Sequence, residues 1–95
     1  MISAISLGDL KNFGAEIQAE AKKYELTDEF RGKVNEFFYI VMDIICEEQG
    51  VDRAGLYKLR SDTELGERSS EAFLDLKIWV HLALDQQRLK QSPVG

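Results

Sequence analysis

The sequence contains a single proline, Pro93, a single cysteine, Cys46, and a single histidine, His81. Because proline breaks helices, nothing before residue 93 forbids them. One cysteine cannot form an intrachain disulfide, so the fold does not depend on an oxidising compartment. The carboxylates have no histidine or cysteine at metal-ligand spacing, and no Gly-x-Ser-x-Gly elbow occurs. We therefore expect no metal site, no cofactor, no catalytic residues and a protein that is not an enzyme.

Long apolar runs are also missing. The longest, residues 37–46, contains Asp43, and the first ten residues lack the basic region and apolar stretch of a signal peptide. We expect a soluble, cytoplasmic protein that does not enter a membrane. The 17 acidic residues outnumber the 12 basic ones, giving a formal charge of −5. This charge disfavours nonspecific binding to nucleic acid or to an anionic membrane, and favours a cationic protein partner.

What the sequence does contain is apolar residues at helical spacing over almost its whole length. Their period predicts helices at about residues 6–24, 28–49, 53–60 and 70–91. Ser6, Thr27 and Asp52 are suited to begin helices, and Gly50 is suited to end one. Residues 61–69 read as a polar connector, in which Ser61 and Glu64 could form a capping box over one further turn. We expect one compact all-α domain of four helices, three long and one short.

The second predicted helix is the centre of the expected core. Its apolar residues fill an arc of roughly 200° on the helical wheel, which is wide enough to pack against several neighbours. They are Phe30, Val34, Phe37, Phe38, Ile40, Val41, Met42, Ile44 and Ile45. Cys46 is expected to be a small buried residue beside them. On the first helix, Gly14 lies on the apolar stripe, where the missing side chain would allow close approach of another helix.

The opposite side of the second helix is acidic. Glu29, Glu36, Asp43 and Glu47 lie nearly in one line, and only Lys33 is placed to offset them. Carboxylates at helical spacing repel one another, so a basic partner would relieve this stripe. The alternative is an ordinary solvated face.

The last predicted helix has two apolar arcs. The larger includes Phe73, Leu76 and Val80, and the smaller holds Ile78, Leu82 and Leu89. An outer helix of a small domain usually has one covered face, so the smaller arc indicates a partner or a homodimer. Alternatively, the first helix packs against it.

One segment resembles a known DNA-binding motif. Residues 42–61 resemble the helix-turn-helix of bacterial repressors and antitoxins. That motif has a small residue near the end of its first helix, a glycine four residues later, and apolar residues at the next position and at two places in the second helix. The matching residues here are Cys46, Gly50, Val51, Leu56 and Leu59. The resemblance covers about 20 residues. It implies that Arg53, Ala54, Tyr57 and Lys58 would face DNA, with Arg60 near a phosphate. Gln49 departs from the apolar pattern of the motif, and an ordinary helix–glycine–helix corner explains the same residues.

His81 lies in the middle of the last predicted helix, on a polar strip with Lys77, Asp85 and Arg88. Histidine phosphotransfer domains place a histidine similarly, but follow it with a lysine and a glycine, where this chain has Leu84 and Asp85. A surface histidine paired with Asp85 one turn later is the simpler interpretation.

Two functional hypotheses follow. The first is a small acidic adaptor, regulatory or inhibitory, that binds a protein partner, and the acidic stripe favours a basic one. Its interface would use Glu36, Asp43, Glu47, Ile78, Leu82 and Leu89. The alternative is a helix-turn-helix DNA-binding transcriptional regulator or antitoxin-like protein, dimeric through the last helix, that uses Arg53, Tyr57, Lys58 and Arg60.

Overall fold

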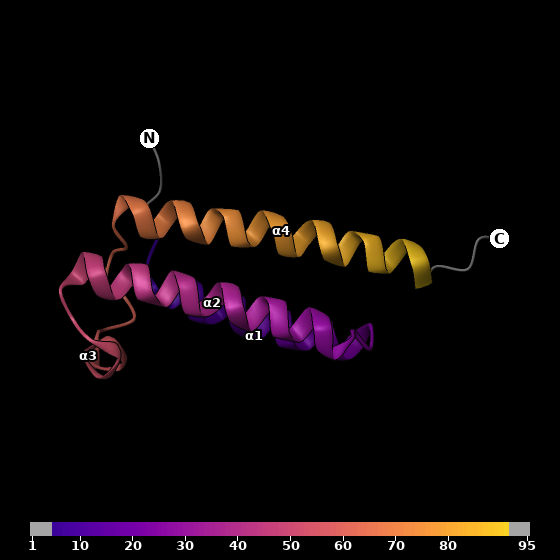
Figure 1. Cartoon of the computed structure of the whole chain (residues 1–95), viewed down its shortest axis with the longest axis horizontal. Coiled ribbons are helices and arrows are strands. Elements are labelled where there is room, and N and C mark those ends of the chain that lie inside the picture. Colours follow the sequence, from indigo (N-terminus) through magenta and orange to yellow (C-terminus); the bar gives the residue numbers. More distant parts are fainter. Residues whose placement is uncertain (1–4, 92–95) are drawn as a thin grey trace.

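The computed structural model describes residues 5–91, with side chains through residue 89, so Pro93 lies outside the described residues. The chain forms α1 (Leu7–Lys23), α2 (Asp28–Gln49), α3 (Arg53–Lys58) and α4 (Glu67–Gln91). The three long helices lie side by side, with α2 antiparallel to α1 and α4, and α3 sits at the end of the bundle where α2 ends (Figure 1). The predicted all-α domain of three long helices and one short helix is confirmed.

Local capping signals account for most helix boundaries. Ser6 and Asp9 form a reciprocal capping box at the start of α1. The Thr27 hydroxyl accepts the Phe30 N–H at 3.2 Å, and the Asp52 carboxylate accepts the Gly55 N–H at 2.7 Å. Gly50 ends α2 in the left-handed region, at φ 68°. These boundaries agree with the prediction to within a residue because each signal lies beside the helix end that it controls.

The region after α3 differs from the prediction. The helix α3 ends at Lys58 rather than at residue 60, and α4 begins at Glu67, three residues before the predicted start at Ser70. Ser61 and Glu64 form no further helical turn, and Glu64 instead pairs with Ser6 in an isolated antiparallel bridge. The connector is not simply polar either, because Leu65 is buried.

The connector satisfies backbone donors at the start of α1. The Leu7 N–H donates to the Thr63 carbonyl at 2.9 Å, and the Gly8 N–H donates to the Ser61 carbonyl at 2.7 Å. The first N–H groups of a helix have no partner within that helix, so these bonds fasten the connector across the end of α1. Gly8 is required there, since a Cβ atom at this residue would lie 2.9 Å from the Ser61 oxygen.

The core lies between the three long helices. Its most enclosed side chains are Val41 and Ile45 of α2 and Phe73 and Val80 of α4. Around them are buried Leu7, Leu10, Phe13, Ile17, Ala21, Leu26, Phe30, Val34, Leu56, Leu65, Leu76 and Leu84. The central position predicted for α2 is therefore confirmed.

The apolar arc of α2 is wider than the core that it meets. Ile40 is 49% exposed, contrary to the prediction that it belongs to the core. The reason is that α2 contacts the core mainly through Val41 and Ile45, so Ile40 lies at the open edge of the contact between α2 and α4. Cys46 is half-buried rather than buried. Gly14 lies near the Phe38 ring of α2, but a Cβ atom there would make only an ordinary contact at 3.5 Å, so the expected close approach of another helix is not found at this glycine.

No helix among residues 5–91 combines the length and the apolar character needed to cross a bilayer. Within the same range, no group of three or more His, Cys, Asp or Glu side chains is arranged to hold a metal ion.

Candidate functional site

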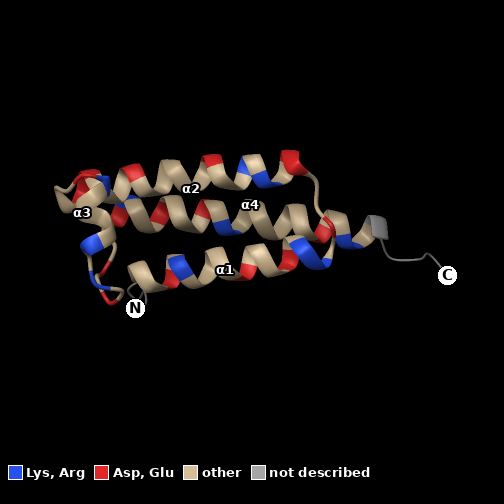
Figure 2. Ribbon diagram, turned by 90° about the horizontal axis from the view of Figure 1, so that it is seen from below, with Lys and Arg blue, Asp and Glu red and all other residues tan. Residues whose placement is uncertain are grey.

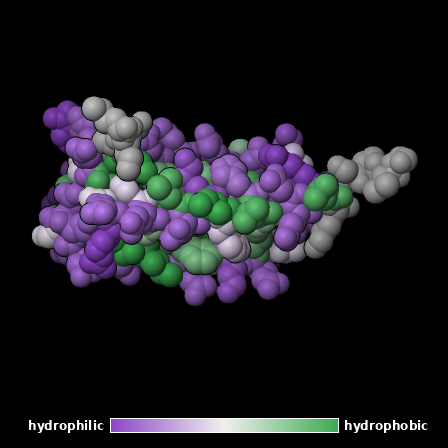
Figure 3. All heavy atoms as spheres, turned by 90° about the horizontal axis from the view of Figure 1, so that it is seen from above, coloured by the Kyte–Doolittle hydropathy of each residue, from purple (hydrophilic) through white to green (hydrophobic). Residues whose placement is uncertain are grey.

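The outer side of α4 carries a row of exposed apolar side chains. Ile78 is 59% exposed, Leu82 60% and Leu89 75%, and Leu74 extends the row toward the start of the helix. Figure 3 looks onto α4 and shows this row as green atoms along its length. The alternative that α1 covers the smaller arc is wrong, since α1 packs on the other side of α4, through Phe13 and Phe73.

A groove between α2 and α4 adjoins this row. Its volume is about 460 Å³, and its lining is mainly apolar. Phe37 and Trp79, whose rings lie 5.1 Å apart, meet in the groove, and Ile40 and Ile44 line it on the α2 side. In Figure 3 a second green area appears on the α2 side of the row. The exposed Ile40 side chain is therefore part of an apolar surface that two helices share.

The groove lies between the two helices that carry the predicted protein interface, although none of the six predicted residues lines it. On α2, Glu36 lies one helical turn before Ile40, and on α4, Leu82 lies one turn after Trp79. We call this combined surface, made of the groove and the row from Leu74 to Leu89, the α2–α4 face. No single stretch of sequence contains it, because residues about 40 apart contribute to it.

The acidic stripe is more compensated than the sequence indicates. Asp43 accepts from Arg53 of α3 at 2.7 Å, and Glu47 pairs with Arg68 of α4 at 3.5 Å. The expectation that only Lys33 offsets the stripe is therefore wrong, because both arginines arrive from other helices. These pairs are exposed, so each contributes little to stability.

Three carboxylates along the α2–α4 face have no such partner. Glu36 on α2 and Glu71 and Asp75 on α4 take part in none of the ion pairs within the described part of the chain. Asp75 lines the groove itself. Figure 2 shows acidic residues in red recurring along both α2 and α4. Both helices therefore contribute unpaired carboxylates to this surface, while the strip of α4 that faces α1 carries Lys77, His81 and Arg88.

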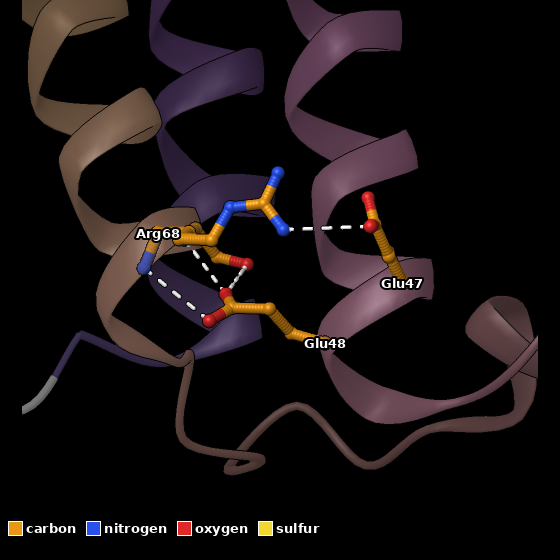
Figure 4. Close-up of polar contacts among 4 residues, drawn as sticks. Glu47, Glu48 and Arg68 are labelled. Carbon is orange, nitrogen blue, oxygen red and sulfur yellow. Dashed lines mark hydrogen bonds and ion pairs between the residues drawn. The ribbon is translucent and has the colours of Figure 1, made fainter.

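Glu48 has a different role from its neighbour Glu47, as Figure 4 shows. Its carboxylate accepts the backbone N–H groups of Arg68 at 3.3 Å and Ser69 at 2.7 Å, and also accepts the Ser69 hydroxyl. The donors lie in the first turn of α4, where backbone N–H groups need an external acceptor. The hydrogen bond from the Ser69 side chain, followed by those from the two backbone groups, lowers the pKa of Glu48.

This contact was not predicted from the sequence, and it explains why α4 begins at Glu67. The cap comes from a different helix, 20 residues upstream of Arg68. Gly66 leaves space for it, because a Cβ atom at residue 66 would collide with the Glu48 carboxylate. Ser69, which is 1% exposed, completes the contact. Gly66, three residues before Ser69, was the only signal in the sequence, and it did not point to Glu48.

The residues implied by the helix-turn-helix resemblance lie on and after α3. Tyr57 is 71% exposed, and Lys58 is exposed. Arg53 is held by Asp43, and its guanidinium lies 4.9 Å from the centre of the Tyr39 ring. Arg60 pairs with Asp62 at 3.0 Å.

The segment also has the geometry of a helix–glycine–helix corner. Beyond the left-handed Gly50, the Val51 N–H donates to the Cys46 carbonyl at 3.0 Å. Gln49, whose polarity departs from the motif, donates to the Glu64 carbonyl at 3.3 Å.

The predicted pair of His81 and Asp85 is corrected. Asp85 pairs with Arg88 at 3.5 Å, and the His81 ring lies 6.0 Å from the Phe13 ring of α1. Arg88 also reaches Glu20 and the Tyr24 ring, so it connects α4 to the end of α1. The polar strip of α4 therefore faces α1 and serves packing between these two helices.

Comparisons with protein-family models, with curated proteins and with solved structures find no match to this chain.

Proposed function

We propose that this protein is a non-catalytic binding module that receives another protein chain on its α2–α4 face. The observation that carries the proposal is the row of Leu74, Ile78 and Leu82 at one-turn spacing, with Leu89 two turns further on, all exposed by 45% to 75% on a helix whose other side is buried. Exposed leucines are common singly, but a contiguous row beside an apolar groove is typical of an interaction surface.

Burial energetics support this use of the surface. Burying a fully exposed large aliphatic side chain is worth about 1.5–3 kcal/mol, and each of the four side chains in the row, already partly covered, would contribute part of this. Association also costs several kcal/mol in lost freedom, so only part of this energy would appear as affinity. The polar groups that begin α1 and α4 are already bonded within the molecule, so they are not available to a partner as the α2–α4 face is.

The proposal keeps the first sequence hypothesis with a changed set of residues. Four residues of the predicted interface remain in it: Glu36, Ile78, Leu82 and Leu89. Two become secondary because arginines already pair with them, namely Asp43 and Glu47. Three are added: Ile40, Leu74 and Trp79. In this proposal the protein works in the cytoplasm as a regulatory or inhibitory adaptor, and binding alone produces its effect.

Site-specific photo-cross-linking tests the proposal. A photoreactive amino acid replaces Leu82 in one variant and the exposed Ala19 of α1 in a matched control, each expressed in the source cells. We expect a discrete adduct at position 82 that excess wild-type protein removes and excess Ile78→Ser/Leu82→Ser protein does not. The same adducts from both positions, or none from position 82, would contradict the proposal.

The DNA-binding alternative has less support from the geometry. A recognition helix must present its side chains to base edges, but α3 spans only Arg53–Lys58 and its arginine is held by Asp43. Glu47 and Asp52 add negative charge around it. We keep DNA binding as the second proposal, and its test is given in the Discussion.

A further inference from the structure

We infer that the occupant of the α2–α4 face is a basic amphipathic helix, which lies along the groove as a fourth helix of the bundle. The inference rests on the proposed function and adds the chemistry of the partner to it. Three arguments support it: the shape of the face, the charges around it, and the like charges that a second copy of this chain would bring to it.

The shape of the face fits a helix. The apolar row runs from residue 74 to residue 89, which is about 22 Å along a helix, and the groove lies between two adjacent helices. A partner helix with apolar residues at positions i, i+4 and i+8 would place them into this surface, as in a four-helix bundle. An extended peptide would need a free sheet edge to bond its backbone, and residues 5–91 form no strand.

The charges around the face select a basic partner. Glu36 lies on the α2 side, Asp75 and Glu71 lie on the α4 side, and none of the three is paired with a cation in the described structure. A helix covering the groove would remove water from these carboxylates, which is unfavourable unless the helix supplies lysine or arginine. A neutral or acidic helix lacks that compensation.

A second copy of the chain fits poorly for the same reason. If two α4 helices pack antiparallel with Ile78 opposite Leu82, then Asp75 lies opposite Asp85 of the other copy. If they pack parallel, each carboxylate faces its own counterpart. These two arrangements bring like charges together, so the charge pattern disfavours them and favours a different chain with the opposite charge.

The inference is tested with three synthetic helical peptides of 18 residues that lack tryptophan. One has a leucine stripe flanked by lysines, the second has glutamates in place of the lysines, and the third is a scramble of the first. Trp79, the only tryptophan of the protein, lies in the groove and reports binding by its fluorescence. We expect the basic amphipathic peptide to bind at least about tenfold more tightly than either of the others, and more weakly as salt rises.

Variants locate the binding site. Leu82→Ser and Ile40→Ser are expected to weaken binding of the basic peptide about tenfold, while Tyr57→Ser, which also removes an exposed large side chain, leaves it unchanged. The double substitution Glu36→Gln/Asp75→Asn is expected to remove most of the preference for the basic peptide over the acidic one. Circular dichroism melting of each variant checks that the fold is retained.

Several results would overturn the inference. They are equal binding of the acidic peptide, equal binding of the scramble, no binding of any peptide, and a dimer of the protein that Leu82→Ser dissociates in light scattering. The cross-linking result at position 82 is independent of the charge of the partner. Failure of the peptides with success of the cross-link would therefore reject the basic helix and keep the proposed binding module.

Discussion

The start of α4 and its outer face differ in how their side chains are used. Those at the start stabilise the fold, and those on the outer face remain available to a partner. At the start, the exposed Glu48 carboxylate fits against Gly66 and accepts hydrogen bonds from the backbone and the hydroxyl of the buried Ser69. On the outer face, Ile78 and Leu82 are exposed, and Asp75 is in no ion pair of the described residues.

The difference shows that residue type alone does not assign a role in this protein. Glu36 and Glu48 both lie on α2, and both are exposed carboxylates. Only Glu48 points at the free N–H groups of another helix, so its charge is used for folding. Substitutions at the start of α4 should therefore change stability, and substitutions on the outer face should change binding.

The largest expected effect is a difference in stability between substitutions of two leucines on opposite sides of α4. Leu76 is 2% exposed, so Leu76→Ala should lower the free energy of unfolding by about 2–5 kcal/mol. Leu82 is 60% exposed, so Leu82→Ala should change it by less than about 0.5 kcal/mol. Urea denaturation followed by circular dichroism measures both. A large loss of stability from Leu82→Ala would show that the outer face is part of the core. It would contradict the distinction between residues that stabilise the fold and residues that are free to bind.

The sequence predicts the helices well and the long-range contacts poorly. Thr27, Gly50 and Asp52 act on neighbouring backbone, so their patterns are visible locally. The exposed arc of α4 was also identified, because apolar periodicity separates two faces of one helix. The Glu48 cap and the ion pairs of Arg53 and Arg68 join different helices, and their partners depend on how the helices are placed.

The intermediate effect concerns two glycines that differ in what surrounds them. Gly66→Ala forces the Glu48 carboxylate away from α4, so it should lower the melting temperature by a few degrees. Gly32→Ala is the matched control, since a Cβ atom at residue 32 meets open space within α2. It should raise the free energy of unfolding by about 0.5–1 kcal/mol, because alanine favours helix over glycine. Equal effects of the two substitutions would reject the cap as a determinant of the fold.

Acid titration tests the same cap by its charge. The pKa of Glu48 is lowered from its ordinary 4.5 by the hydrogen bonds from Ser69 and Arg68. The stability that the ionised group contributes is therefore complete above pH 4.5 and is lost as the pH falls through the lowered pKa. Glu48→Gln should remove this part of the pH dependence, while the part due to Asp9, whose pKa is also lowered, remains. Superimposable pH profiles would contradict the assignment.

The smallest effect is expected at α3, where the comparison extends to a third region. A DNA-binding surface needs cations free to meet phosphate, but Arg53 is held by Asp43 and Arg60 by Asp62. We therefore expect no duplex binding in fluorescence anisotropy at low salt, and no difference between the wild type and Arg53→Glu/Lys58→Glu. Binding that falls steeply with salt and disappears in this double variant would instead show that α3 releases Arg53 to a stronger anion. The helix-turn-helix proposal would then displace the binding-module proposal, because a chain with a charge of −5 binds DNA only through a surface organised for it.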